Sequence, residues 1–591
     1  MNDLLLLPRP RELEHYDGEG APANATVSET EERELSPEAY RLRIADGQIS
    51  LAYADAAGRR YAHANLKQLK RSCGEMLPAL EILDWPDFPV RGYMLDISRD
   101  RVPTRGTLAR LVDVLDLLRI NHLQLYTEHT FAYTGHETVW GEASPLTGAD
   151  VEWLDGLCAE RGIELVANQN TFGHMARWLR HPAYRDRAEA PEGFDTKFGT
   201  HLAAAVLAPT EDNADFALGL CRELLAHHRS RRINIGCDET FELGKGQSAA
   251  DVEARGKHRV YLDHLLRLIH GLHADGREVL FWGDILRDHP ELAAELPKTD
   301  VVALAWHYEA PSDPSALPDA LFEVLSDFGI TRDSLRGFEA HVRSFEQAGV
   351  PFWVCPGTST WNTLIGRLRN ARGNLLDAAE IGLSHGAGGY LITDWGDNGH
   401  MQPLAVSWPP LAYGAALAWC LEANRNLDVA PALDAFVFED EAGVLGALLD
   451  RIGNLFDATG KTAMNGSALF TDLLSGGALL GSMGETDPER TAQTVIELDE
   501  AIAELQNARP AASDGEIVRL ELAAALHLAR HGAWRIARGA GLPRPSDPEL
   551  AADLGSAISR QREAWLARSR SGGLADSLAR LEKVLAEYAR A

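Results

Sequence analysis

The feature that most constrains the fold is a series of eight short apolar segments between residues 89 and 425, each followed by a helical stretch. The segments begin near Val90, His122, Ile163, Ile233, Val279, Val301, Phe352 and Gly389. Amphipathic patterns such as residues 104–119 and 257–274 lie between them. Continuous apolar character is typical of parallel strands that helices cover on the outside, so the repeats predict a (β/α)8 barrel. A doubly wound sheet is the alternative, but no Gly-rich phosphate-binding pattern follows the first strand.

The regions on either side have different patterns. In residues 1–88, two alternating segments, 40–44 and 49–53, flank Asp46-Gly47, which predicts a β-hairpin. Residues 61–70 then read as a helix, and residues 17–35 as an exposed loop. We therefore predict a small α/β domain over residues 1–88, a catalytic barrel over 89–425 and a helical domain over 426–591. In the last of these, apolar residues recur at steps of three and four, at Leu574, Leu578, Leu581, Leu585 and Tyr588.

Composition excludes some partners and suggests a compartment. With 57 basic and 87 acidic residues, the net charge of −30 argues against nucleic acid or an anionic membrane surface as a partner. The six cysteines form no C-x-x-C motif and mostly lie in apolar segments, which indicates reduced, buried thiols. The first residues, MNDLLLLPRP, do not match a signal peptide, and no apolar run is long enough to span a bilayer. We expect a cytoplasmic protein.

Aromatic and acidic residues gather where the predicted strands end. In a (β/α)8 barrel the carboxyl ends of the strands carry the active site. Four tryptophans stand at or just after such ends, at Trp282, Trp306, Trp361 and Trp395. Aromatic rings stack on the C–H faces of sugars, and carboxylates bind sugar hydroxyls, so the pattern indicates a carbohydrate site. The alternative for any one tryptophan is that it packs in the core.

Two adjacent carboxylates, Asp238 and Glu239, close the apolar segment at residues 233–237. Their mutual repulsion is expected to raise one pKa, which a general acid at neutral pH requires. The alternatives are a helix N-cap or a pair of metal ligands.

Several stretches resemble glycoside hydrolase family 20, the β-N-acetylhexosaminidases. They are GRRYAHANLKQL at 58–69, RGYMLDISRD at 91–100, FGH at 172–174, INIGCDE at 233–239 and Trp-x-acid at 395–397. The resemblance covers roughly residues 36–400. It implies a barrel enzyme without a cofactor or metal that releases terminal β-linked N-acetylglucosamine or N-acetylgalactosamine with retention of configuration. In this family the substrate's own acetamide assists catalysis through an oxazolinium intermediate.

The resemblance also implies roles for individual residues. Glu239 matches the general acid/base, and Asp238 matches the residue that orients the acetamide. Arg91 matches the arginine that holds ring hydroxyls. The remaining substrate contacts implied are Glu128 as partner of His174 or of a hydroxyl, Trp282, Trp306 and Trp395 as aromatic walls, Asp397 on the outer hydroxyls, and Tyr308 or Trp361 on the acetamide oxygen. The family usually has Asp-Asp where this chain has Glu128-His129, and Glu where it has Asp397.

Two other functions remain open from the sequence. A metal-dependent barrel hydrolase would use His129, His136, His174 and Asp238 as ligands, although no H-x-H or H-E-x-x-H spacing occurs. A non-catalytic sugar-binding protein could also be built on a hydrolase barrel, but it would have no need for the Asp238-Glu239 pair.

Overall fold

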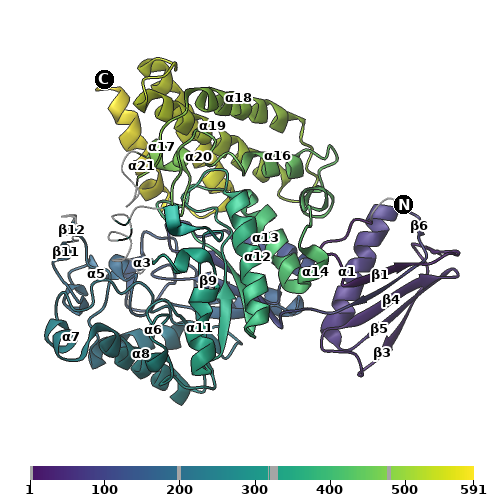
Figure 1. Ribbon diagram of the computed structural model, residues 1–591, viewed down its shortest axis with the longest axis horizontal. Helices are drawn as coiled ribbons and strands as arrows, with labels where there is room; N and C mark the ends of the chain where they lie inside the picture. Colours follow the sequence, from purple (N-terminus) through teal and green to yellow (C-terminus); the bar gives the residue numbers. More distant parts are fainter. Residues whose placement is uncertain are drawn as a thin grey trace.

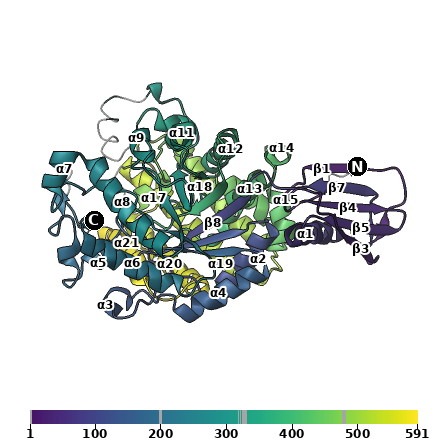
Figure 2. The ribbon, with the colours of Figure 1, turned by 90° about the horizontal axis from the view of Figure 1, so that it is seen from below.

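The computed structural model describes residues 4–195, 201–316, 331–474 and 481–590, together with Asp319 and Phe322. Figure 1 shows three regions: an N-terminal sheet with one long helix, a strand barrel ringed by helices, and a group of C-terminal helices above the barrel. Seen from below, in Figure 2, the N-terminal sheet projects from one end of the molecule.

The central sheet is a closed barrel in the order β10-β13-β14-β15-β16-β17-β8-β9, and every neighbouring pair is parallel. Its strands are β8 (Val90–Asp96), β9 (His122–Tyr126), β10 (Glu164–Asn168), β13 (Arg232–Asn234), β14 (Glu278–Trp282), β15 (Val301–Trp306), β16 (Phe352–Cys355) and β17 (Gly389–Asp394). Each lies in one of the eight apolar segments, so the predicted (β/α)8 barrel is confirmed.

Helices cover the outside of the barrel. The longer ones are α2 (Arg105–Leu117), α4 (Gly148–Glu160), α6 (Glu211–Leu225), α8 (Lys257–Ala274), α11 (Glu339–Ala348), α12 (Leu368–Ser384) and α13 (Leu404–Trp419). Side chains that cap backbone N–H groups fix where several begin: Thr104 for α2, Thr147 for α4 and Thr210 for α6. Helix α13 is apolar on all sides and almost wholly buried, as expected for a helix between the barrel and a further layer.

The N-terminal sheet has the order β1-β7-β4-β5-β3, with α1 (Ala56–Cys73) packed on it. Its strands are β1 (Glu12–His15), β3 (Val27–Glu31), β4 (Tyr40–Ala45), β5 (Gln48–Tyr53) and β7 (Leu80–Asp84). The hairpin predicted at Asp46-Gly47 is confirmed: both residues have positive φ, 51° and 74°, as a tight two-residue turn requires. The exposed loop predicted over 17–35 is wrong in part, because β3 pairs with β5 through its backbone while most of its side chains remain exposed.

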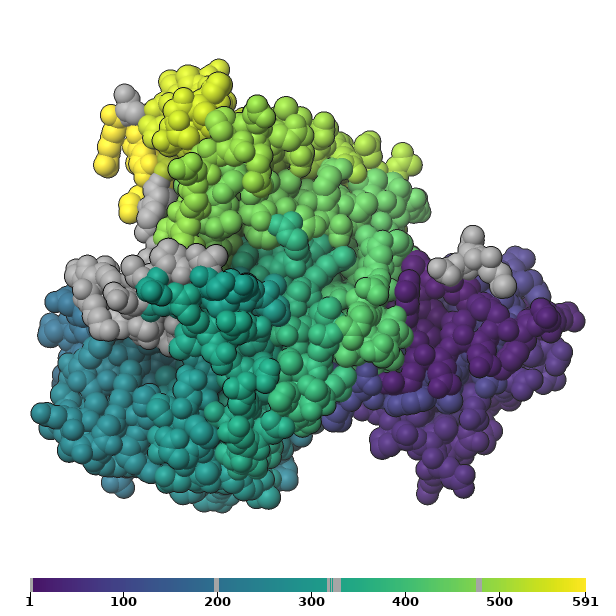
Figure 3. Space-filling view, in the orientation of Figure 1, coloured from purple at the N-terminus to yellow at the C-terminus, as the bar shows by residue number. Residues whose placement is uncertain are grey.

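The C-terminal region is helical, as predicted. Its main helices are α16 (Leu445–Ile452), α17 (Ala468–Leu473), α18 (Pro488–Glu504), α19 (Gly515–Gly539), α20 (Asp547–Arg568) and α21 (Leu574–Tyr588). Figure 3 shows these helices lying against the barrel. They share one continuous apolar core with the barrel, whereas the N-terminal sheet has a second core, to which Trp419 and Cys420 of the barrel layer also belong. The exact domain boundaries stay predictions.

A buried ion network joins the C-terminal helices to the loop after β8. The guanidinium of Arg568 lies 2.8 Å from both Glu521 and Asp514, and Arg101 lies 3.5 Å from Glu521. Arg568, Glu521 and Arg101 are all buried. Charges removed from water require such partners, so this loop and these helices are held in one arrangement.

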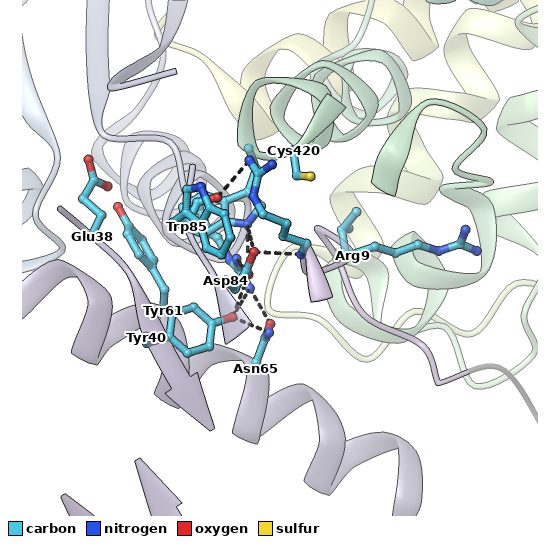
Figure 4. A network of polar contacts seen from close by, with 12 residues as sticks. Arg9, Glu38, Tyr40, Tyr61, Asn65, Asp84, Trp85 and Cys420 are labelled. Atoms are coloured by element: carbon cyan, nitrogen blue, oxygen red, sulfur yellow. Dashed lines mark hydrogen bonds and ion pairs between the residues drawn. The ribbon is translucent and has the colours of Figure 1, made fainter. Parts of the chain in front are cut away.

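A buried carboxylate, Asp84, is one of the links between the N-terminal sheet and the barrel. Asp84, at the end of β7, accepts hydrogen bonds from Tyr40 (2.8 Å), Arg119 (2.7 Å) and Trp419 (2.9 Å). Arg119 and Trp419 belong to the barrel layer, whereas Tyr40 belongs to the sheet. Figure 4 shows Asp84 at the centre of this network, with Tyr40 and Asn65 beside it.

Arg91 belongs to the same end of the barrel, which corrects its predicted role as a substrate-binding residue. It is the second residue of β8 and is fully buried. Its guanidinium pairs with Glu38 at 2.6 Å, donates to the hydroxyl of Tyr61 at 2.9 Å, and lies over the ring of Trp419. The start of a barrel strand lies opposite the catalytic face, so Arg91 joins the N-terminal sheet to the barrel.

We predict that Arg91→Met destabilises the protein without changing catalysis. Breaking a buried ion pair typically costs about 3–5 kcal/mol, because the remaining charge is left without a partner. The thermal midpoint should therefore fall, while KM on a β-N-acetylglucosaminide, the substrate class implied by the sequence resemblance, should not change. Arg59→Met, which removes an exposed pair with Glu29, is the control. A raised KM with an unchanged thermal midpoint would contradict this prediction and indicate that Arg91 binds substrate.

Candidate active site

The carboxyl ends of the eight strands bring the candidate residues to one rim of the barrel. The side chains gathered there are Arg99 after β8, Glu128 after β9, His174 after β10, Asp238 and Glu239 after β13, Trp282 and Asp284 at β14, Trp306 and Tyr308 at β15, Trp361 after β16, and Trp395 and Asp397 after β17. Every predicted site residue except Arg91 is therefore at this rim.

The turn that carries the two catalytic candidates has unusual backbone geometry. Cys237 and Glu239 have φ of 70° and 49°, in the left-handed region that side chains other than glycine rarely adopt. The FGH loop after β10 packs directly on this turn: a Cβ on Gly173 would lie 2.3 Å from the carbonyl oxygen of Asp238. Glycine at position 173 is thus what allows His174 to approach the carboxylates.

His174 bridges the two carboxylates. Its Nε2 lies 3.2 Å from Oδ2 of Asp238 and 3.4 Å from Oε2 of Glu239. Burial alone would lower the pKa of His174, but the Asp238 carboxylate overcomes this and raises that pKa well above its usual value. Burial alone would raise the pKa of Asp238, but the charge of His174 outweighs this effect and lowers that pKa. At neutral pH the pair is therefore an imidazolium beside an ionised Asp238.

Asp284 is a third carboxyl group at this point, and the sequence analysis did not select it. Its Oδ2 accepts a hydrogen bond from the backbone N–H of Glu239 at 3.2 Å. Burial, and then the charge of Asp238, raise the pKa of Asp284 to about 7. The raised pKa that was predicted for one member of the Asp238-Glu239 pair is found at Asp284 instead, and His174 lowers the pKa of Asp238.

Arg99 is an arginine at the candidate site that the sequence-based prediction missed. Its guanidinium lies over the rings of Tyr126 (4.6 Å) and Trp395 (5.0 Å), and its Nε is 3.4 Å from Glu128. Its Nη2 also lies 3.4 Å from Nδ1 of His174. RGYMLDISRD contains two candidate arginines, and the rule that active sites form beyond strand ends would have selected the second.

The aromatic residues form one cluster inside the barrel mouth. The indole N–H of Trp395 donates to the hydroxyl of Tyr308 at 2.8 Å, and Tyr308 stacks on Trp306 with ring centroids 5.2 Å apart. Trp361 meets Tyr308 edge-on at 4.9 Å. Trp282 and Trp361 are buried, whereas Trp306 and Tyr308 remain half-buried at the mouth. The alternative that a tryptophan packs in the core therefore holds for Trp282 and Trp361. These inner rings support Trp306 and Tyr308, which face outward.

Two contacts decide which polar atoms of this cluster remain available. The indole N–H of Trp361 donates to Oδ1 of Asn465, 2.9 Å away in the C-terminal region. The hydroxyl of Tyr308 accepts from Trp395 at 2.8 Å and also has the side chain of Thr393 as a hydrogen-bond partner. Of the two residues considered for the acetamide oxygen, Trp361 has its one N–H engaged by Asn465, which leaves Tyr308 as the candidate.

Asp397 is half-buried at the rim beside β17. Its Oδ2 accepts from the side-chain amide of Asn362 at 3.1 Å. Burial raises the pKa of Asp397 to about 6, although Arg99 opposes the shift. Asp397 is thus a hydrogen-bond acceptor at neutral pH and becomes neutral in mild acid.

The ligands proposed for a metal do not converge. Nδ1 of His136 lies 2.6 Å from the hydroxyl of Tyr184, while His174 is engaged by Asp238 and Glu239. In the part of the chain that the structure describes, no group of three or more His, Cys, Asp or Glu side chains is arranged to hold a metal ion. Nor is any helix in the described ranges long and apolar enough to cross a membrane.

Fold and site together define a (β/α)8 barrel with a carboxylate pair and an aromatic mouth, the kind of site that acts on sugars. Two family models match the sequence: glycosyl hydrolase family 20, domain 2, over residues 6–85, and the catalytic domain of the same family over residues 88–320. Together they cover more than half of the 591 residues. The chain belongs to glycoside hydrolase family 20.

Curated relatives carry hexosaminidase names. Human hexosaminidase D is 28% identical over 233 residues, which are 38% of this chain and 46% of that protein. The β-hexosaminidase of Akkermansia muciniphila is 28% identical over 200 residues, 30% of this chain and 40% of that protein. The matches thus span less than half of each of these two relatives.

Solved structures with this fold include a Flavobacterium johnsoniae chitobiase, with a TM-score of 0.56 at 14% identity, covering 98% of this chain and 99% of that one. The exo β-N-acetylglucosaminidase of Vibrio harveyi, solved with N-acetylglucosamine, has a TM-score of 0.53 at 16% identity and covers 73% of this chain and 77% of that one. At these identities the likeness concerns the fold.

Asp284 gives a prediction for the pH dependence of stability. Its pKa in the folded protein, about 7, lies above the value of roughly 4 for aspartate in an unfolded chain. The folded state therefore holds a proton that the unfolded state has lost, and the stability from this group, full below about pH 4, is lost as the pH rises through 7. Asp284→Asn removes the titration, so its thermal midpoint should fall less between pH 5 and pH 8 than that of the wild type.

Asp288→Asn, four residues further on and exposed, is the matched control and should follow the wild-type curve. Parallel midpoint curves for wild type and Asp284→Asn across this range would contradict the assignment.

Proposed function

We propose that this protein is an exo-β-N-acetylhexosaminidase that releases terminal β-linked N-acetylglucosamine or N-acetylgalactosamine with retention of configuration. The observation that carries the proposal is the Asp238-His174-Glu239 arrangement at a rim lined with aromatic rings. The hexosaminidase names of the relatives support the substrate class.

Glu239 is the proton donor in this proposal. Its side chain is 38% exposed, so it can reach a glycosidic oxygen at the mouth, whereas the Asp238 side chain is only 7% exposed. Glu239 protonates the leaving oxygen, and the bond from C1 to that oxygen breaks. A general acid in this position typically contributes about 10²–10⁴ in rate.

Asp238 orients the nucleophile, which belongs to the substrate. Its ionised carboxylate accepts a hydrogen bond from the acetamide N–H, and the acetamide oxygen attacks C1 to form an oxazolinium ring. Water then attacks C1 from the side of the departed group and gives a proton to Glu239, which restores the acetamide and the acid. Two inversions at C1 give net retention.

The remaining rim residues hold the sugar. Tyr308 donates its hydroxyl hydrogen to the acetamide oxygen, and the tryptophan cluster keeps water from that side of the ring. Arg99, Glu128 and Asp397 supply donors and acceptors for the ring hydroxyls. The family carboxylate on the outer hydroxyls is usually Glu, so the shorter Asp397 requires the sugar to sit closer to β17.

The natural substrate in this proposal is an oligosaccharide or glycoconjugate with a terminal N-acetylhexosamine. Location in the cytoplasm is part of the proposal as well. Its support is that all six cysteines are free thiols, five of them buried, as is common for proteins in reducing compartments. The net charge of −30 is the argument against nucleic acid or an anionic membrane surface as a partner.

The exo mode is tested with chitin oligomers. Because tryptophans from several strand ends enclose the mouth, we expect room for one sugar and release of N-acetylglucosamine monomer from the first time point. Chromatography of the products measures this. The appearance of dimers or trimers before monomer would contradict the exo assignment.

The separate roles of the two carboxylates give a second test. Glu239→Gln should retain more activity on a nitrophenyl glycoside, whose leaving group needs little protonation, than on a natural disaccharide. Asp238→Asn should slow both substrates by similar factors, because every substrate needs an oriented acetamide. It should also weaken binding of a thiazoline mimic of the cyclic intermediate.

Steady-state kinetics on both substrates and calorimetry with the thiazoline supply the measurements. Equal losses for the two variants across both leaving groups would sink the substrate-assisted mechanism, and so would unchanged thiazoline binding to Asp238→Asn. A carboxylate nucleophile would then have to be sought at Glu128 or Asp397.

A further inference from the structure

A turn from the C-terminal region reaches the barrel mouth. It consists of residues 463–466 and lies just before α17, in a part of the chain that follows the 88–320 segment matched by the catalytic family model. Ala463 and Gly466 pair across it, and Asn465 at its tip has a φ of 52°. Asparagine is one of the few residues other than glycine that adopt this conformation readily.

Asn465 contacts the barrel with its backbone and with its side chain. Its N–H donates to Oε1 of Glu309 at 2.7 Å, and its carbonyl oxygen accepts from the side-chain amide of Asn362 at 3.3 Å. Its Oδ1 accepts the indole N–H of Trp361 at 2.9 Å. An indole N–H can only donate, so it is the amide oxygen of Asn465 that faces the ring.

The barrel residues held by Asn465 belong to two sides of the sugar site. Trp361 packs edge-on against Tyr308, the proposed acetamide donor, with ring centroids 4.9 Å apart. Asn362, in turn, donates to Asp397, the proposed contact for the outer hydroxyls, at 3.1 Å. One residue outside the barrel therefore connects the acetamide side and the hydroxyl side of the site.

The turn is firmly held from both directions. Thr462 and Met483 exchange two backbone hydrogen bonds of 2.9 and 2.7 Å on the side of the C-terminal region. On the barrel side, Glu309 is fixed by Arg367, whose two terminal nitrogens lie 3.1 and 2.7 Å from its carboxylate oxygens. A bidentate pair of this kind fixes orientation as well as distance.

The turn also packs closely on the barrel. A Cβ on Gly466 would lie 3.1 Å from both Cβ and the carbonyl oxygen of Asn362, and the N–H of Ser467 donates to that oxygen at 3.0 Å. Because the two backbones are in close contact, a change at the tip of the turn is expected to displace Trp361 and Asn362.

We infer that Asn465 is a positioning residue for sugar binding: it fixes the indole of Trp361 against Tyr308, and its backbone fixes Asn362 against Asp397. The inference rests on the proposed hexosaminidase function. It assigns the C-terminal helical region a part in the sugar site. The contacts of Asn465 are with Glu309, Trp361 and Asn362, and not with Asp238 or Glu239.

The test compares three variants with the wild type on nitrophenyl β-N-acetylglucosaminide. Asn465→Gly keeps the positive φ and removes only the side chain, so Trp361 loses its acceptor. We expect KM to rise by up to about tenfold, the order expected for the loss of one hydrogen bond, with a much smaller change in kcat because the catalytic pair is untouched. Asn465→Asp keeps both the backbone conformation and an acceptor oxygen, and should restore KM to near the wild-type value.

Lys461→Ala is the matched control. It removes the pair with Asp472 in the same segment but no contact with the barrel, so its KM should equal that of the wild type. Calorimetry with a thiazoline inhibitor gives the same comparison without turnover, and the thermal midpoint of each variant is recorded alongside.

The outcomes separate the inference from the proposed function. If the wild type neither cleaves the substrate nor binds the thiazoline, the proposed function fails and the role of Asn465 fails with it. If the wild type is active and Asn465→Gly has the same KM, only the inference is overturned. It is also overturned if Lys461→Ala raises KM as much, or if Asn465→Gly lowers kcat and leaves KM unchanged.

Discussion

Closure of the parallel sheet is the constraint on which the rest of this structure depends. Because β17 pairs with β8 and β9 with β10, the ends of all eight strands meet around one rim. Residues as far apart in the chain as Arg99 and Trp395 thereby come into contact, with the guanidinium 5.0 Å from the ring. Each strand end supplies only one or two side chains, and the site exists only when the circle is complete.

Closure also brings several carboxyl groups close together, and other groups of the site offset their mutual repulsion. Carboxyl groups of Asp238, Glu239, Asp284 and Asp397 lie at the rim, and Arg99 and His174 face them. His174 keeps Asp238 ionised, whereas Asp284 and Asp397 have pKa values raised to about 7 and about 6. The protein thus keeps Asp238 charged and lets Asp284 and Asp397 bind protons near neutrality, which limits the negative charge at the rim.

The features that could be predicted from the sequence are those whose pattern lies within a few neighbouring residues. The eight strands and the hairpin at Asp46-Gly47 were predictable because apolar period and turn chemistry are local. Strand β3 was not, because its exposed side chains carry no apolar signal and its pairing is made by the backbone. Arg91 and Arg99 lie eight positions apart on one segment, and only their place relative to the strand end separates an interface residue from a site residue. Asn465 had no sequence signal, since its role arises from the approach of a distant turn.

The network around Asp84 has a consequence for how the molecule comes apart. The apolar core of the N-terminal sheet is distinct from the one shared by the barrel and the C-terminal helices, although Trp419 and Cys420 at the end of α13 belong to it, and two cores ordinarily melt as two units. Opening the sheet, however, would strip Arg119 and Trp419 of their carboxylate partner while both remain inside the barrel layer. This energetic cost couples the unfolding of the two cores, so the chain should unfold in one cooperative transition. The sheet then stabilises the end of the barrel opposite the candidate site.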